Sequence, residues 1–299
     1  MTSSGTKRRW QRVDGVLLLD KASGLTSNSA LQGARRLFSA AKAGHTGTLD
    51  PLATGLLPLC FGEATKFSAD LLNADKTYEA DLLFGITTDT GDAEGAIVLQ
   101  RPVAFTQSDL ETALLGFLGP ISQIPPMYSA LKRDGKPLYE LARQGIEVER
   151  EAREVTIHEL QLLDFSGDRC RLRVSCSKGT YIRTLAEDIG NILGCGAHLT
   201  ALRRTVVGPL SIDDAVTLEY LNTLSDDDRV KTLLAPDALL QSLPAVYLGD
   251  EETLKFSHGN PVSAVAAPGK CRVYGGNRLL GLGEADASGK VNPRRLVCV

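Results

Sequence analysis

The sequence predicts a mixed α/β (α+β) protein in which helices flank a sheet, followed by a small all-β domain at the C-terminus. Apolar runs typical of strands, such as Val13–Leu19, alternate with amphipathic segments such as Asn28–Ala41. After about Pro244, short β-like runs alternate with Gly, Pro and Asn turns, a pattern typical of a small barrel or sandwich. A length of 299 residues permits one large and one small domain. We therefore place a domain boundary near residue 245.

The N-terminal half predicts strands and helices in alternation. Residues 1–11 are polar and basic, and we expect them to be disordered. Val13–Leu19 predicts a buried strand, and Asn28–Ala41 predicts a helix because its apolar residues recur near the helical period. Ala43–Leu57 is dense in glycine and predicts a constrained loop. Tyr78–Phe84 predicts a short strand.

The second half continues the alternation. A helix is predicted over Asp109–Leu118, and Ile124–Arg153 is polar and interrupted by proline, which predicts a long excursion from the core. Two strands, Arg153–Phe165 and Arg169–Ser177, and a helix over Tyr181–Leu193 follow. The C-terminal strands are expected at Val262–Val265, Lys270–Tyr274, Leu279–Gly283 and Leu296–Val299.

Charge and cysteine content limit the class of partner and compartment. The net charge is −3, so the overall field does not indicate a nucleic-acid partner, although three local basic clusters favour a polyanionic one. The six cysteines form no C-x-x-C pair and lack histidines at zinc-ligand spacing, which predicts free thiols in a reducing compartment. No apolar run approaches the roughly 20 residues of a membrane span, and no signal sequence is evident. The cytoplasm is the expected location.

A single carboxylate, Asp50, lies in the glycine-rich stretch AGHTGTLDPLATGLL at residues 43–57. Pro51 disfavours helical backbone at Asp50, and Gly47 and Gly55 permit conformations closed to other residues. The pattern therefore predicts an acid presented on an extended or turning segment. An isolated Asp-Pro is more often a simple turn, but the density of glycine on both sides makes a functional acid about as probable.

Arg183 is placed where a cation is unfavourable. Thr180 is a plausible N-cap, so Arg183 falls in the first turn of its helix, where the dipole disfavours a positive charge by roughly 0.3–1 kcal/mol. Either Glu187 at i+4 or a carboxylate from elsewhere in the fold would compensate. A partnered aspartate would stay ionised, as a nucleophile requires. Tyr78, His45 and Lys21, taken alone, have ordinary structural explanations.

Six motifs together resemble the TruB family, the bacterial tRNA pseudouridine synthases that act on the T-loop uridine at tRNA position 55. They span about residues 14–210, with one departure, Ala22, where the family usually carries proline. The tail from about residue 247 is similar, less specifically, to a PUA-type RNA-binding domain. The motifs are GHTGTLDPLATGLL at 44–57, DKASGLTSN at 20–28, KTYEADLLFG at 76–85, IPPMYSALKRDGKPLYELAR at 124–143, SKGTYIRTLAEDIG at 177–190 and LTALRRTVVGP at 199–209.

The resemblance implies roles for individual residues. Asp50 matches the catalytic aspartate, Arg183 the arginine paired with it, and Tyr78 the tyrosine that stacks on the target base and helps to move its proton. The remaining matches imply contacts with substrate or RNA, or support of the active-site loop: His45 packs against RNA, Leu202 forms an apolar pocket wall, Lys21 supports the loop, and Lys132 and Tyr181 contact RNA.

The resemblance also implies an architecture and a set of partners. It predicts a largely antiparallel sheet, a catalytic domain over residues 12–245 with an RNA-gripping insertion at about 122–153, and a PUA-like domain over residues 246–299. The partner is the T-arm of tRNA. No cofactor, metal, membrane or protein partner is implied, and we expect a monomer.

The implied reaction breaks the C1′–N1 bond, turns the uracil and rejoins it through C5. Such an isomerisation needs no cofactor, but the base must first leave its stack, at a cost of a few kcal/mol. Asp50 would attack C1′ of the ribose or C6 of the base, and the sequence leaves both open. The alternatives are an RNA-binding protein or RNA-folding helper without catalysis, a synthase for another RNA, and a glycoside hydrolase, which would need a second carboxylate.

Overall fold

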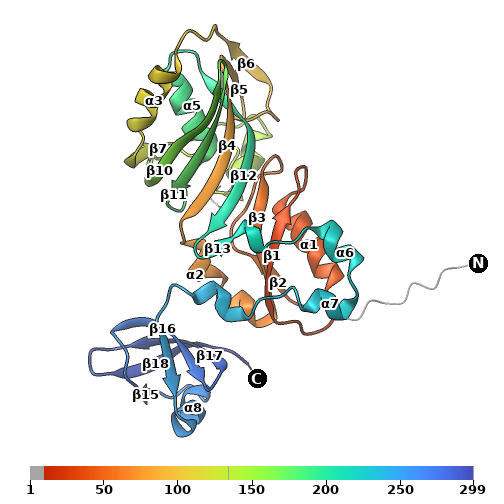
Figure 1. Cartoon of the computed structure of the whole chain (residues 1–299), viewed down its shortest axis with the longest axis vertical. Helices are drawn as coiled ribbons and strands as arrows, with labels where there is room; N and C mark the ends of the chain where they lie inside the picture. The colour runs from red at the N-terminus through yellow and green to blue at the C-terminus, as the bar shows by residue number, and fades with distance from the viewer. Residues whose placement is uncertain (1–9, 134, 299) are drawn as a thin grey trace, which may run out of the picture.

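Two sheets organise the chain in the computed structural model, which describes residues 10–133 and 135–298 (Figure 1). The larger sheet has nine strands and the smaller one has five. The strands of the large sheet are β1 Gly15–Lys21, β2 Ala43–His45, β3 Thr54–Phe61, β4 Lys76–Phe84, β7 Gly119–Gln123, β10 Arg153–Ser166, β11 Arg169–Cys176, β12 Ala197–Val207 and β13 Leu210–Ser211.

Helices and short hairpins surround this sheet, and α3 and α5 lie at its end farthest from the C-terminal domain (Figure 1). The α-helices are α1 Ser27–Leu37, α2 Ser68–Leu72, α3 Gln107–Leu115, α4 Leu138–Ala142, α5 Ile182–Ile192, α6 Leu218–Thr223 and α7 Asp226–Val230. The 3-10 helices are η1 Gly62–Lys66, η2 Ile212–Asp214 and η3 Pro236–Leu240, and the hairpins pair β5 Ile86–Thr88 with β6 Ile97–Gln100 and β8 Lys132–Arg133 with β9 Lys136–Pro137.

The C-terminal domain is a five-stranded sheet in the order β14-β16-β17-β18-β15, with one helix. Its strands are β14 Ala245–Leu248, β15 Val262–Ser263, β16 Gly269–Gly275, β17 Arg278–Ala285 and β18 Lys290–Leu296, and its helix is α8 Asp250–Ser257. The prediction that this domain would be entirely β is wrong at α8, whose Phe256 packs into the domain's core.

The large sheet confirms the predicted mixed, largely antiparallel architecture. Its strand order is β1-β3-β12-β4-β11-β10-β7. The β3–β12 pair is parallel, and the other strand pairs of this sheet within the described residues are antiparallel. Alternate residues of β4 (Ala80, Leu82 and Phe84) are buried against the apolar face of α5, as the period of two requires. In this order β3, β12 and β4 lie inside the sheet rather than at an edge.

Two central strands were not predicted. The stretch Ala43–Leu57 is predicted as a loop, but from Thr54 onward its residues form the start of β3. Most of the motif at residues 199–209 lies on β12. Seven of the eight β3 residues are buried, because neighbours cover both faces of the strand. Such a strand lacks the apolar–polar alternation by which a half-buried strand is recognised.

The sequence predicts disorder over residues 1–11, and the structure describes only Trp10 and Gln11 of this range. Residues 1–9 lie outside the described residues. Gln11 pairs with Ala40 in a β-bridge, and Arg35 lies 4.6 Å over the ring of Trp10. Disorder is therefore wrong for Trp10 and Gln11, which a cation–π contact and backbone pairing hold in place.

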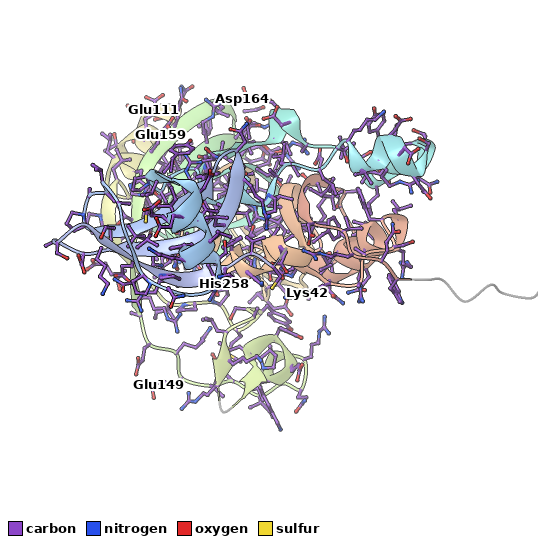
Figure 2. All side chains as sticks on the ribbon, turned by 90° about the horizontal axis from the view of Figure 1, so that it is seen from below. Lys42, Glu111, Glu149, Glu159, Asp164 and His258 are labelled. Carbon is purple, nitrogen blue, oxygen red and sulfur yellow. The ribbon has the colours of Figure 1, made fainter. Side chains whose placement is uncertain are left out.

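Between β7 and β10 the chain leaves the body of the molecule. Figure 2 shows this segment, with Glu149 labelled, projecting away from the rest of the protein. It contains the β8–β9 hairpin and α4, and its Leu138 is buried. The predicted excursion thus has a hairpin and a short helix of its own, with a buried leucine at the start of the helix.

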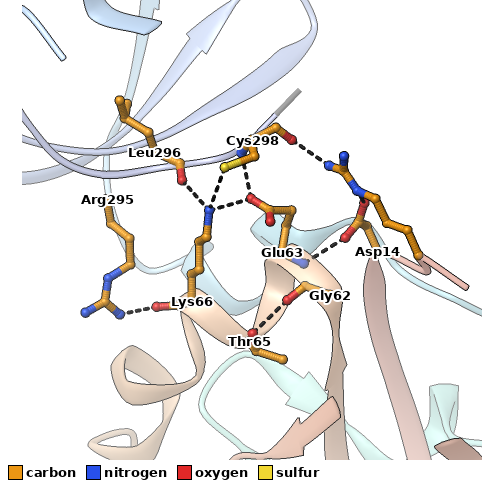
Figure 3. A network of polar contacts seen from close by, with 9 residues as sticks. Asp14, Gly62, Glu63, Thr65, Lys66, Arg295, Leu296 and Cys298 are labelled. Carbon is orange, nitrogen blue, oxygen red and sulfur yellow. Dashed lines mark hydrogen bonds and ion pairs between the residues drawn. The ribbon is translucent and has the colours of Figure 1, made fainter. Parts of the chain in front are cut away.

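The last residues of the chain bind the C-terminal domain to the large domain (Figure 3). The Lys66 ammonium donates to Glu63 at 2.7 Å and to the Leu296 carbonyl at 2.9 Å. The Cys298 N–H donates to Glu63 Oε2 at 2.6 Å, and Arg12 donates to the Cys298 carbonyl at 2.6 Å. Polar contacts from both ends of the chain therefore meet at η1.

Gly55 marks the closest approach of β3 to β12. Its φ is +98°, and an added Cβ would lie 2.3 Å from the Arg204 carbonyl oxygen. We expect Gly55→Ala to lower the free energy of unfolding by at least about 3 kcal/mol, because clash and backbone strain add. Gly167→Ala is the matched control, since its φ is +66° and a Cβ there meets nothing within 4 Å. Urea unfolding measures both, and equal losses would contradict a clash at Gly55.

Candidate active site

A pocket of about 170 Å³ opens where β4, β12, the start of α5 and the projecting segment meet. Most of the residues singled out from the sequence line it together. Its lining residues are Thr48, Leu49, Asp50, Tyr78, Ser129, Ala130, Thr180, Tyr181, Ile182, Arg183 and Leu202.

Asp50 lies between β2 and β3 on a segment without regular structure, as predicted. Pro51 follows it, and the Ala53 N–H donates to the Asp50 carbonyl at 3.1 Å, which turns the chain into β3. The Asp50 side chain remains 43% exposed, so its carboxylate is open to a substrate. Ser27 holds the preceding residue, because its hydroxyl both donates to the Leu49 carbonyl and accepts from the Leu49 N–H.

Arg183 is the pocket's buried cation, with its side chain 6% exposed. Its Nη2 lies 3.0 Å from Asp50 Oδ2, so the partner is a carboxylate from elsewhere in the fold. Among the residues that the structure describes, Glu187 forms no ion pair with Arg183, and the i+4 alternative is therefore wrong. The guanidinium also donates to the carbonyls of Thr90 at 2.9 Å and Tyr128 at 2.6 Å. These contacts hold it in one orientation.

The start of α5 differs from its prediction. The N-cap residue is Tyr181, and Thr180 instead donates its hydroxyl to the Ser177 carbonyl at 2.9 Å. Gln123 of β7 anchors the N-cap residue, since its Oε1 accepts from the Tyr181 N–H at 3.0 Å and its Nε2 donates to the Tyr181 carbonyl. A residue distant in sequence therefore fixes the helix turn that carries Arg183.

Tyr78, Leu202 and Tyr181 supply the apolar part of the pocket. Tyr78 on β4 is partly buried, and burial raises the pKa of its hydroxyl while the nearby Arg204 charge lowers it. Leu202 on β12 is 9% exposed, and burial also raises the pKa of Tyr181. A carboxylate beside two aromatic rings and an aliphatic wall suits nucleophilic attack on a flat, ring-bearing group.

Lys21 and His45 lie next to the loop rather than in the pocket lining. Lys21 is 1% exposed, and its ammonium donates to the carbonyls of Leu25 at 2.7 Å and Pro51 at 3.4 Å. Burial lowers the Lys21 pKa to about 8. His45 accepts from the Gly47 N–H, and burial with the Arg204 charge lowers its pKa. Both residues therefore brace the backbone around Asp50.

Lys132 lies apart from this group. It is exposed at the start of the β8–β9 hairpin, where it lines a separate cavity with Arg133, Glu149 and Arg150. The structure therefore places Lys132 on the projecting segment and not beside Asp50. A contact between Lys132 and RNA requires RNA that extends beyond the pocket.

Asp92 is a site residue that the sequence reading missed. It is 4% exposed, and its Oδ2 lies 3.6 Å from Arg183 Nε. Thr90 and the Glu94 N–H both donate to its other oxygen, at 2.6 and 3.1 Å. Arg183 thus bridges an exposed aspartate and a buried one. The spacing of the acidic residues around Asp92 in the sequence does not indicate that Asp92 lies beside Arg183.

Three arginines on strands of the large sheet pair with carboxylates on other strands of that sheet. Arg171 pairs with Asp81 at 2.6 Å, Arg173 with Glu79 at 3.6 Å and Arg203 with Asp20 at 2.7 Å.

Within residues 10–133 and 135–298, no cluster of three potential metal-ligating side chains occurs, and no helix is long and apolar enough to cross a membrane.

Glu187 of α5 is an acid with a raised pKa outside the pocket lining. Burial raises its pKa to about 7, and the charge of Asp188 adds to the increase. Because the folded-state pKa exceeds the unfolded value, Glu187 stabilises the fold fully below about pH 4.3 and loses this contribution as pH rises through 7. We expect Glu187→Gln to raise the free energy of unfolding by about 1–2 kcal/mol at pH 8 and to change it little at pH 4.5. Urea unfolding at both pH values tests this, with exposed Glu154→Gln as control; a pH-independent effect would contradict it.

Three family models match consecutive parts of the chain. "TruB family pseudouridylate synthase (N terminal domain)" matches residues 35–182, "tRNA pseudouridylate synthase B C-terminal domain" matches 183–243, and "Pseudouridine synthase II TruB, C-terminal" matches 244–297. Together they cover residues 35–297.

Curated proteins and solved structures agree with these matches. "tRNA pseudouridine synthase B" of Dechloromonas aromatica (strain RCB) is 64% identical over 97% of this chain and 98% of its own length. The protein of the same name from Aromatoleum aromaticum is 60% identical over 95% of this chain and 93% of its own. A chain in a "Cbf5-Nop10-Gar1 Complex" structure has a TM-score of 0.74 and 24% identity, covering 98% of this chain and 91% of that one, which shows a shared fold.

Proposed function

This chain belongs to the TruB family of pseudouridylate synthases, and from that premise we propose that Asp50 is the nucleophile of its reaction. The reaction is the isomerisation of the T-loop uridine at tRNA position 55 to pseudouridine. The observation that carries the assignment is the ion pair at 3.0 Å between the exposed Asp50 carboxylate and the buried Arg183. A carboxylate held in this way is both accessible and oriented.

The pocket supports a role for each neighbour. Tyr78 offers a ring on which a flipped uracil stacks, and Leu202 adds an apolar wall to the pocket. Asp50 forms a bond to C1′ of the ribose or to C6 of the base, and the C1′–N1 bond breaks. C1′ then bonds to C5, and the bond from Asp50 breaks, which returns the free carboxylate. The C5 proton leaves to solvent as N1 gains one, so atoms and charge balance. Lys21 and His45 brace the loop, and Tyr181 and Lys132 contact the RNA.

We further propose the domain limits and the partner. The change of family model between residues 243 and 244 and the start of β14 at Ala245 support a catalytic domain over 12–245 and a PUA-like RNA-binding domain over 246–299. The projecting segment at 122–153 grips the T-arm.

Free thiols at all six cysteines support a reducing, cytoplasmic location. Light scattering of the free protein and of its tRNA complex tests the proposed monomer.

Tritium release from C5-tritiated uridine in an unmodified tRNA transcript tests the function. We expect release in proportion to enzyme turnover, because the C5 proton is lost once per pseudouridine formed. A transcript with cytidine in place of the T-loop uridine is the control and releases none. Tight tRNA binding without release would exclude this reaction and leave an RNA-binding or RNA-folding protein.

A further inference from the structure

Arg204 is a buried cation in the motif at 199–209 to which neither the matched residue roles nor the mechanism assign a function. It lies on β12 with 1% of its surface exposed, among the largest fully buried side chains in the described chain. Buried arginines are normally paired with carboxylates, because desolvating an unpaired charge costs several kcal/mol. Arg203 beside it pairs with Asp20, but among the described residues Arg204 forms no ion pair.

Main-chain carbonyls on both sides of Asp50 take the place of a carboxylate. Arg204 Nε donates to the Leu56 carbonyl at 2.8 Å, and Nη2 donates to the Gly47 carbonyl at 3.2 Å. Gly47 precedes Asp50 and Leu56 follows it, so one guanidinium holds both ends of the segment that presents the nucleophile. Gly55 is the position that lets the Arg204 backbone approach this segment.

The same guanidinium lies next to Tyr78. Arg204 and Tyr78 are register partners in the β12–β4 ladder. The Arg204 charge opposes the rise that burial causes in the Tyr78 pKa, and it adds to the lowering of the His45 pKa by burial. Arg204 therefore forms hydrogen bonds to both ends of the loop that carries Asp50, and it lies beside Tyr78 on the neighbouring strand.

We propose that Arg204 is a positioning residue that fixes the Asp50 loop relative to Tyr78. It does not line the pocket, so it acts on the substrate through these two neighbours. This assignment rests on the proposed function of the same site. A neutral donor would satisfy two carbonyls without desolvating a charge, and the planar, forked guanidinium is the side chain that reaches both carbonyls at once.

The test compares Arg204→Lys and Arg204→Met with the same changes at Arg229. Arg229 is the matched control because it is 8% exposed and also donates to main-chain carbonyls, those of Leu37, Leu221 and Leu224, away from the pocket. We expect the Arg204→Lys single-turnover rate on tRNA to fall about 10- to 100-fold with tRNA affinity within about threefold. We expect Arg229→Lys to keep its rate despite a comparable loss of stability.

A second readout does not depend on activity. Hydrogen exchange of the free protein is expected to accelerate over residues 46–56 in both Arg204 variants and not in the Arg229 variants. The His45 pKa, followed by NMR, is expected to rise in Arg204→Met, which loses the charge, more than in Arg204→Lys. An unchanged single-turnover rate, or equal rate losses in both pairs, would overturn the proposal. If the wild type releases no tritium, the proposed function fails, and unchanged exchange over 46–56 still overturns the positioning role.

Discussion

Asp50→Asn is expected to lower the single-turnover rate of tritium release by at least about 10⁴-fold, or about 5.5 kcal/mol in activation free energy. The amide matches the carboxylate in size but is not a nucleophile. The fold and tRNA binding should persist, because the Asp50 side chain is 43% exposed and Arg183 keeps its contacts with Asp92, Thr90 and Tyr128. Rate and tRNA affinity, measured on the same transcript, separate catalysis from binding.

The matched control for Asp50→Asn is Asp81→Asn. Asp81 also pairs with an arginine, Arg171 at 2.6 Å, and its side chain is 33% exposed, but it lies on the charged face of the sheet away from the pocket. We expect its rate to stay within about threefold of wild type, since surface pairs contribute only about 0–1 kcal/mol. Retention of more than about a tenth of wild-type activity by Asp50→Asn would exclude Asp50 as the nucleophile.

Arg183→Met is expected to lose both activity and stability. Without the guanidinium, Asp50 loses its orienting partner, and we expect the rate to fall about 10²- to 10³-fold. Asp92, which is 4% exposed, is left as a buried carboxylate without a cation, at a cost of about 3–5 kcal/mol in the free energy of unfolding. Single-turnover assays and urea unfolding measure the two losses separately.

A double variant separates the two roles of Arg183. Asp92→Asn in the Arg183→Met background removes the buried charge and is expected to recover about half of the lost stability. The rate should not recover, because Asp50 still lacks its partner. Recovery of both together would mean that Arg183 acts only by stabilising the fold.

The sequence by itself determined the features that depend on neighbouring residues. Glycine and proline around Asp50 predicted an acid presented on irregular backbone, and the structure places it there. An arginine in the first turn of a helix predicted a cation that needs a compensating partner. The strands at β4, β10 and β11 followed from alternation of apolar and polar residues, which one covered face imposes on a strand.

Only the tertiary structure decided which partners meet. Strand β3 is buried on both faces, and β12 carries the buried Arg204. Neither strand therefore shows the alternation of apolar and polar residues by which a half-buried strand is recognised. Arg183 takes its carbonyl partners from residues 93 and 55 positions away, and Arg204 bonds a carbonyl 148 positions away. Propensity acts over a few residues, whereas burial and ion pairing depend on which distant strands become neighbours. For that reason the sequence predicted the presented acid Asp50, and the fold alone placed Asp92 and Arg204 around it.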